Sequence, residues 1–192
     1  NLYTTFLNPE MINYGRKKHS TIHFLDFQLT EDINIGIFEA ILWNSKSESR
    51  ELGYEFGYMN PIIFYRPVEF SMQSNKGNAL MGSYFHTSYE SSFPIQHRGL
   101  LYGQIMLDDL NISRRKDRDV NYSEGFLQNK FAFQFGLKTK IRGVNLLAEY
   151  NQVQPYTYGH RTILQNYSHM NQALAHPLGA NFKELIWIVD YR

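Results

Sequence analysis

The side chains best suited to binding chemistry gather in one predicted loop. Residues 155–182 combine tyrosines, amides and histidines, and apart from the histidines their only charged side chain is Arg161. Aromatic rings stack on the apolar faces of pyranoses, while amides and arginine form hydrogen bonds with sugar hydroxyls. This composition predicts a surface that contacts a sugar or a protein partner. The residues expected to make that contact are Tyr156, Tyr158, His160, Arg161, Tyr167 and His169.

The same loop also fits a structural role. A long ordered loop must satisfy the hydrogen bonds of its own backbone. Flexible solvent loops are richer in charge, glycine and serine than residues 155–182 are. We therefore expect this loop to be ordered and to fold over or into the mouth of a barrel, and the structural and binding roles can coexist.

Metal and cofactor chemistry has little support in the sequence. His160, His169 and His176 are spaced nine and seven residues apart, whereas zinc sites on one element use pairs a few residues apart. The chain has no cysteine, which excludes disulfides, thiolate ligands and cysteine nucleophiles. No metal and no cofactor are expected.

Catalysis is not expected either. No GxSxG nucleophile elbow is present. The carboxylates predicted to face inward come from different strands, and their spacing does not suggest an acid/base pair; they are Asp26, Glu55, Asp108 and Glu149. The sequence therefore predicts a non-enzymatic protein, with a soluble β-sandwich enzyme as an alternative.

The elements that must position the loop are strands. Residues 126–150 contain two runs of alternating apolar and polar side chains, joined by a predicted three-residue turn, 141–143. In the first run Phe133 and Phe135 lie on one face, and Gln134 lies on the other. That pattern predicts a β-hairpin. Its apolar face would pack against a core in a soluble sandwich and against lipid in a transmembrane barrel.

Similar alternation predicts about eight strands in a single domain over 1–192. The predicted ranges are 18–30, 33–44, 52–58, 78–90, 98–110, the two arms of the hairpin 126–154, and 184–192. In the second strand Glu39 interrupts a row of isoleucines. A bulge near Phe38 would turn Glu39 inward and the apolar Phe38, Ala40 and Leu42 outward.

The predicted connections alternate between short and long. Residues 45–51, 91–97 and 141–143 are short, whereas 59–77, 111–127 and 155–182 are long and fall at the other end of the strands. Bacterial membrane barrels have short turns on one side and long loops on the other. The alternation therefore favours an up-and-down barrel over a sandwich. The short turn at Glu31-Asp32 is an exception, because this strand count places it on the long-loop side.

Two further patterns accompany the strands. Prolines at 61 and 67 predict a short helix or packed turn over 60–69, in which Arg66 and Glu69 could pair. Aromatic residues near strand ends would form interfacial girdles in a barrel, although ordinary β-propensity explains the same pattern. They are Trp43, Tyr54, Tyr58, Tyr89, Tyr102, Tyr150, Trp187 and Tyr191.

Composition and charge exclude other classes. The chain has 192 residues, 16% aromatic residues and a net charge of +1, and its mean hydropathy is -0.43. It has no run of roughly 18 uncharged apolar residues, so a helical membrane protein is excluded. The charge is spread along the chain, so no nucleic-acid partner is expected. The absence of a starting methionine and a final strand at the terminus predict a fragment or a processed product.

Several segments resemble the capsule assembly Wzi family of outer-membrane proteins. They are NIGIFEA at 34–40, YMNPIIFYRPVE at 58–69, LYGQIMLDD at 101–109, EYNQV at 149–153, and the stretch from PYTY at 155–158 to HMNQALAHPLGANF at 169–182. The resemblance covers most of the chain, and the last stretch is the most specific. It is closest to the RemB-like branch of gliding bacteria.

The resemblance implies an outer-membrane β-barrel larger than 192 residues can close, of which this chain would be the C-terminal part. Wzi-like proteins are lectin-like, hold capsular polysaccharide at the cell surface and are not known as enzymes. The gliding branch is linked to motility and adhesion. No sugar-contacting residue can be carried over position by position.

The sequence therefore predicts an all-β protein: an antiparallel up-and-down transmembrane β-barrel in the bacterial outer membrane. Its expected partners are outer-membrane lipid and surface or capsular polysaccharide. The alternative function is an accessory barrel subunit of a gliding-motility or protein-secretion complex, whose loops contact other outer-membrane proteins.

Overall fold

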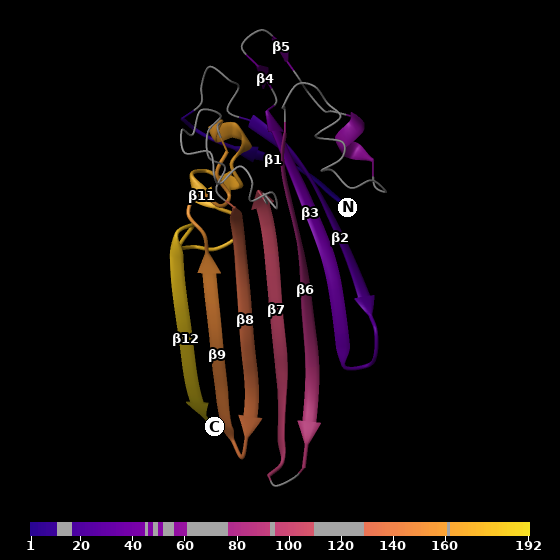
Figure 1. Ribbon diagram of the computed structural model, residues 1–192, viewed down its shortest axis with the longest axis vertical. Helices are drawn as coiled ribbons and strands as arrows, with labels where there is room; N and C mark the ends of the chain where they lie inside the picture. The colour runs from indigo at the N-terminus through magenta and orange to yellow at the C-terminus, as the bar shows by residue number, and fades with distance from the viewer. Residues whose placement is uncertain are drawn as a thin grey trace, which may run out of the picture.

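The computed structural model describes residues 1–10, 17–44, 46–47, 50–51, 56–60, 77–92, 95–109, 129–160 and 162–192. These residues form one large antiparallel sheet of eight strands (Figure 1). The strands are β1 (Leu2–Leu7), β2 (Lys17–Gln28), β3 (Ile33–Asn44), β6 (Gly77–Ser91), β7 (His97–Asp109), β8 (Lys130–Ile141), β9 (Val144–Val153) and β12 (Phe182–Tyr191). None of the helices in the described ranges has the length and apolar character needed to span a membrane.

Each strand of this sheet pairs with the next one along the chain, in the order β1-β2-β3-β6-β7-β8-β9-β12. The prediction of an all-β, up-and-down antiparallel sheet is confirmed. The sheet does not close on itself, since β1 and β12 stand at opposite edges. The strand β1 was not predicted, because its six residues, LYTTFL, do not alternate between apolar and polar side chains.

Short elements occupy the long connections. Two small hairpins pair β4 (Lys46–Ser47) with β5 (Arg50–Glu51) and β10 (Ser168–His169) with β11 (Gln172–Ala173). Two 3-10 turns, η2 (Phe56–Met59) and η4 (Ile163–Gln165), lie before β6 and before β10.

The predicted strand over 52–58 is wrong. Residues 56–59 form η2, and 52–55, including Tyr54 and Glu55, lie outside the described residues. Tyr58 is buried and its ring lies 5.2 Å from that of Trp43. The alternation over 52–58 suggested a strand paired in the sheet, but Tyr58 instead packs its side chain against Trp43. The predicted turn over 60–69, with its Arg66 and Glu69 pair, also lies outside the described residues beyond Asn60.

Without that strand, the alternation of connections has no exception. The turns after β2, β6 and β8 are short and share one end of the sheet, while the connections after β1, β3, β7 and β9 lie at the other. The Glu31-Asp32 turn therefore belongs to the short-turn end. There the carbonyl of Asp32 accepts a hydrogen bond from the backbone N–H of Ser88 at 2.9 Å.

The β8–β9 turn is tighter than the predicted three residues. Ile141 pairs with Val144, which leaves Arg142 and Gly143 as the turn. Both have positive φ, 45° and 87°. Two such residues match the type I′ turn, whose twist fits a two-residue hairpin.

The predicted bulge at Phe38 is also wrong. Pairing of β3 with both neighbours runs without a shift through Phe38, so Glu39 lies on the same face as Ile35 and Ile37. Its carboxylate lies 2.8 Å from Nδ1 of His23, the residue directly opposite on β2. This partner lets a carboxylate stay on an apolar face, so the register need not change.

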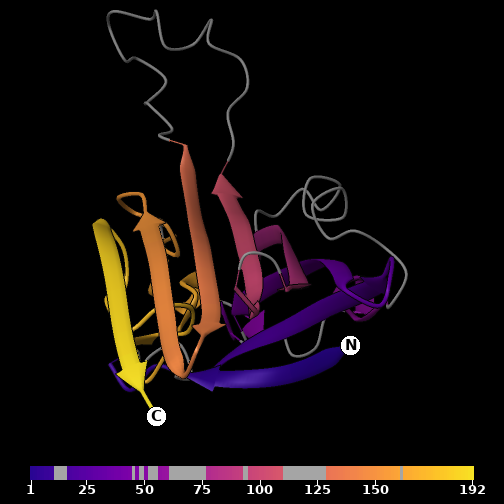
Figure 2. The same cartoon turned by 90° about the horizontal axis from the view of Figure 1, so that it is seen from below.

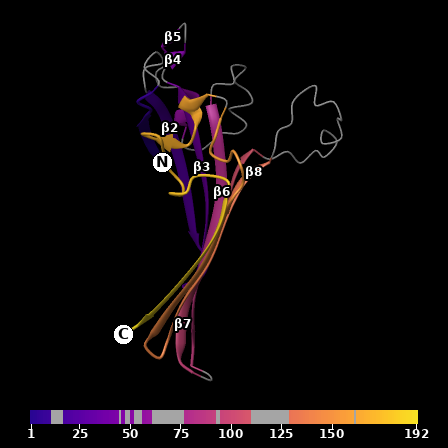
Figure 3. The same cartoon turned by 90° about the vertical axis from the view of Figure 1, so that its left-hand side faces the viewer.

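The two faces of the sheet differ sharply. One face, here called the convex face, carries exposed large apolar side chains over much of its area: Leu25, Phe27, Ile33, Ile35, Ile37, Phe85, Ile105, Phe135, Leu185, Trp187, Val189 and Tyr191. The other, called the concave face, curves around residues 154–181 (Figure 2). These residues, the 154–181 segment, lie at the end of the sheet that carries the long connections (Figure 3).

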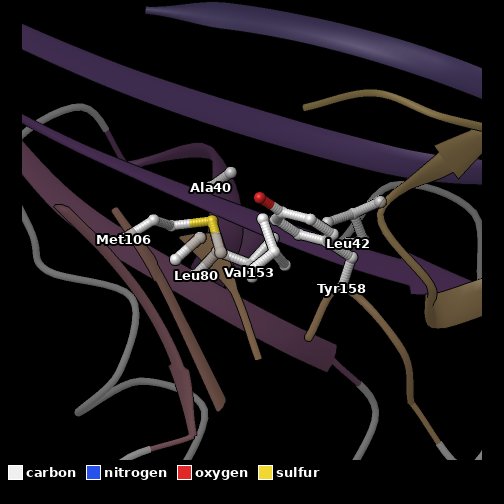
Figure 4. Close-up of a cluster of buried hydrophobic side chains, with 7 residues drawn as sticks. Ala40, Leu42, Leu80, Met106, Val153 and Tyr158 are labelled. Carbon is white, nitrogen blue, oxygen red and sulfur yellow. The ribbon is translucent and has the colours of Figure 1, made fainter. Parts of the chain in front are cut away.

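The main core lies between the concave face and the 154–181 segment. The segment contributes Tyr158 to this core, and the sheet contributes Ala40, Leu42, Leu80, Met106 and Val153 (Figure 4). A smaller core of Ile41, Trp43, Tyr58 and Ala79 lies on the convex face beneath η2. Trp43 and Tyr58 are therefore buried in this core and do not belong to an exposed aromatic girdle.

Candidate functional site

The described residues of the 154–181 segment contain short regular elements and pack against the sheet. The segment contains η4 and the β10–β11 hairpin, whose two turn residues, Met170 and Asn171, have φ of 49° and 64°. Left-handed backbone at Tyr156 and Tyr158 turns the chain just after β9. The segment thereby folds back onto the sheet.

Side chains of four strands bind the backbone of this segment. Lys18 Nζ donates to the carbonyl of Asn166 at 2.5 Å, and Lys130 Nζ donates to that of Gly159 at 2.9 Å. Asn78 Nδ2 donates to the carbonyl of Gln165 at 3.0 Å. In the opposite sense, Asp108 Oδ2 accepts the backbone N–H of Tyr158 at 2.9 Å. The sheet thus supplies hydrogen-bond partners to backbone groups of an irregular, packed segment.

Tyr158 and Tyr167 belong to the core. Tyr158 is buried, and the partly buried Tyr167 packs against it with ring centroids 6.2 Å apart. Burial, with nearby Tyr167 and Asp108, raises the pKa of Tyr158 to about 12. Burial likewise raises the pKa of Tyr167. Both residues hold the segment in place, so neither forms the exposed contact surface that the sequence suggested.

The other predicted contact residues are dispersed. Tyr156 is 75% exposed, whereas His160 is half-buried and its backbone N–H donates to Asn166 Oδ1 at 2.6 Å. His169 Nδ1 accepts the backbone N–H of Leu7 at 3.1 Å. Arg161 lies outside the described residues. The structure therefore does not gather the five described residues of this set into one surface.

A different set of polar residues comes together on the concave face below the 154–181 segment. One row of cross-strand neighbours crosses the sheet through Gly36 of β3. The row, here called the polar belt, consists of Asp26, Tyr84, Gln104, Gln134, Asn151 and Glu184.

Hydrogen bonds fix both ends of the polar belt. The Tyr84 hydroxyl donates to Asp26 Oδ1 at 2.6 Å. At the other end, Asn151 Nδ2 donates to Glu184 Oε2 at 3.0 Å and to Glu149 Oε1 at 2.8 Å. Gln104, near the middle, is exposed.

The polar belt borders a cavity of about 300 Å³ under the 154–181 segment. Tyr158, Tyr167 and His176 contribute from the segment, and Gln104, Gln134 and Asn151 contribute from the belt. His176 Nε2 lies 3.3 Å from Glu184 Oε2 and so links the segment to the belt.

The next row toward the short-turn end repeats the chemistry. The Tyr102 hydroxyl donates to Glu149 Oε2 at 2.5 Å, and Lys138 Nζ lies 5.5 Å from the centre of the Tyr102 ring. Beyond it, a groove of about 780 Å³ is lined by cations and carboxylates of both signs. They include Arg98, Lys138, Lys140, Asp32, Glu90 and Asp190.

This arrangement can bind a ligand rich in hydroxyl groups. Amides and carboxylates offer donors and acceptors, and tyrosine rings offer flat apolar faces. Among the described residues no group of three or more histidine or acidic side chains could hold a metal ion. Sequence reasoning identified the polar face of single strands but missed the row, because its alignment depends on register across the sheet.

Comparisons with known proteins add no assignment. No family model matches this chain, and neither a curated protein nor a solved structure does.

Proposed function

We propose that this chain forms part of the wall of an outer-membrane β-barrel that binds or anchors surface polysaccharide without catalysing a reaction. The observation that carries the proposal is the contrast between the faces of the sheet. The convex face exposes large apolar side chains, whereas the concave face carries the polar belt. Membrane barrels show this division, with lipid outside and water inside.

Strand length supports the same proposal. A membrane-crossing strand needs about 9–11 residues. β8 has 12 residues, and β9 and β12 have 10 each. In the proposed barrel the open edges of β1 and β12 pair with further strands, because unpaired backbone groups are too costly in hydrocarbon.

Polysaccharide is the proposed ligand because the concave face combines amides, carboxylates and tyrosines beside a cavity. The resemblance of several segments to Wzi-like proteins agrees with this choice. The test is calorimetric titration of the full-length protein, extracted in mild detergent, with oligosaccharides released from the surface polysaccharide of the source bacterium. Saturable heat is expected, and its absence would remove the polysaccharide role.

A second candidate is a subunit of a motility or secretion complex. The outward side of the 154–181 segment exposes several large apolar residues: Tyr156, Ile163, Met170 and Leu178. Exposed apolar patches at loops favour protein contacts. Mild detergent extraction followed by native gel electrophoresis tests this role. A stable complex that is lost on Leu178→Asp and Met170→Asp substitution, together with no glycan binding, would favour it.

A further inference from the structure

Three aromatic rings form a row on the concave face, and the central ring, Tyr84, belongs to the polar belt. Phe24 of β2 and Tyr84 of β6 have ring centroids 5.3 Å apart and planes inclined by 13°. Tyr84 and His86 are 6.4 Å apart and inclined by 7°. The three planes are therefore nearly parallel, although β3 separates the strand of Phe24 from the strand that carries Tyr84 and His86.

Gly36 of β3 creates the place for the central ring. A Cβ atom at Gly36 would lie 2.5 Å from Tyr84 Cζ, so the Tyr84 ring lies directly over this glycine. Tyr84 is fixed there by its hydrogen bond to Asp26 at 2.6 Å.

Exposure of Phe24 distinguishes this row from ordinary packing. Phe24 is 58% exposed, yet it lies on the polar face of the sheet. On the convex face exposed rings have lipid as a partner in the proposed barrel, but the concave face meets water. Because Phe24 stacks on Tyr84, which is bonded to Asp26, its exposed ring adds an apolar surface directly beside polar groups.

We infer that the stack of Phe24, Tyr84 and His86, here called the platform, is a contact site for pyranose rings of the polysaccharide, with the exposed Phe24 ring as its stacking face and Asp26 as hydrogen-bond acceptor. This inference rests on the proposed function and names its contact site. Sugar C–H groups cover the exposed Phe24 ring, and the lone pairs that Asp26 does not use with Tyr84 accept hydrogen bonds from sugar hydroxyls. Asn34, opposite His86 on β3, adds an amide beside the platform.

The charge at the platform selects the class of sugar. Asp26 is the carboxylate bonded to the central ring, so a uronic acid placed there would meet a like charge. The platform therefore favours neutral pyranoses.

Tyr102 makes a useful contrast. Its ring also lies over a glycine, Gly136, and its hydroxyl also bonds a carboxylate. Lys138 Nζ, however, lies over the Tyr102 ring. That face is already covered by a cation, so the row around Tyr84 is the better stacking surface.

The test uses full-length protein in mild detergent and neutral oligosaccharides released from the surface polysaccharide of the source bacterium, titrated by calorimetry. Tyr84→Leu and Phe24→Leu should each weaken binding about tenfold, the order expected for one lost ring contact. Tyr84→Phe keeps the ring and should retain most of the affinity. Phe85→Leu is the matched control, because Phe85 lies over Gly103 in the same way but on the convex face, and it should leave affinity unchanged.

The outcomes separate the two claims. If the unaltered protein binds and both leucine variants bind equally well, the platform is wrong and the polysaccharide role stands. If the unaltered protein binds no oligosaccharide, both claims fall. Phe24 is exposed, so Phe24→Leu should fold even if Tyr84→Leu does not, and it decides the question alone in that case.

Discussion

The ammonium group of Lys18 donates a hydrogen bond to the backbone carbonyl of Asn166 at 2.5 Å, across 148 residues of sequence. It also donates to Ser168 Oγ at 3.1 Å. Lys18 belongs to β2, and its side chain is fully buried beneath the 154–181 segment. One side chain of β2 thus holds the segment at the point where η4 leads into β10.

We predict that Lys18→Met loosens the 154–181 segment while leaving the sheet intact. Methionine keeps the length of the side chain but removes the hydrogen bonds of the ammonium group, so the Asn166 carbonyl keeps only the backbone N–H of Ser168 as a donor. Loss of hydrogen bonds to a charged group costs about 1.5–3 kcal/mol. Limited proteolysis on intact cells measures the effect, with faster cleavage expected between 160 and 176. Lys140→Met, at an exposed position, is the control. Equal protection of both variants would contradict the anchoring role.

We predict that Tyr158→Ala destabilises the protein by about 3–5 kcal/mol, as large-to-small substitutions of buried aromatic residues do. Tyr158 lies in the main core, whereas Tyr156, two residues earlier, is exposed. Tyr156→Ala should change stability by less than about 0.5 kcal/mol. Urea unfolding of the detergent-extracted protein compares the two. Similar decreases in the free energy of unfolding would show that the Tyr156 side chain is also packed in the folded protein.

Substitutions on the two faces of β8 test whether lipid covers the convex face. Phe135 is exposed on the convex face, and its neighbour Gln134 lies in the polar belt. In the proposed barrel, Phe135→Arg should cost about 2–4 kcal/mol, because it places a charge in hydrocarbon, and Gln134→Arg should cost less than about 1 kcal/mol. Refolding into lipid vesicles at increasing urea measures both. Equal costs would mean that no lipid covers the convex face.

The contact between Gly36 and Tyr84 predicts that a substitution at Tyr84 offsets the destabilising effect of a substitution at Gly36. Gly36→Ala should cost about 1–3 kcal/mol, since the new Cβ must displace the Tyr84 ring. Tyr84→Ser removes the ring, so adding Gly36→Ala to Tyr84→Ser should cost little. A double-mutant cycle from urea unfolding gives the coupling. Additive losses would show that the ring can move aside without strain.

Much of the sheet follows from local pattern. Phe133, Gln134 and Phe135 alternate, and the turn at 142–143 sets the register that places Gln134 opposite Asn151. Extending such register from turn to turn would have found part of the polar belt. The rows across long connections could not be found in this way, because no turn fixes how β3 meets β6 or how β7 meets β8.

Other features depend on contacts that local pattern does not contain. Alternation over 52–58 was real, but Tyr58 packs with Trp43 instead of extending a strand. Glu39 broke the pattern of β3, and only the neighbouring strand supplies the partner, His23, that makes it acceptable. Tyr158 and Tyr167 were expected at the surface because tyrosine suits both a sugar site and a core, and tertiary packing decides between them.

The hydrogen bonds between β1 and the 154–181 segment have a consequence for how the protein assembles. Met170 N donates to the carbonyl of Leu7 at 2.8 Å, and Leu7 N donates to His169 Nδ1. Within the large sheet, by contrast, each strand pairs with the sheet strand that follows it along the chain. The sheet can therefore form hairpin by hairpin, at little cost in loop-closure entropy. The hydrogen bonds of Leu7 can form only after residues 169 and 170 have been synthesised and have folded against β1. Closure of the segment is therefore expected to be the slow final step of folding.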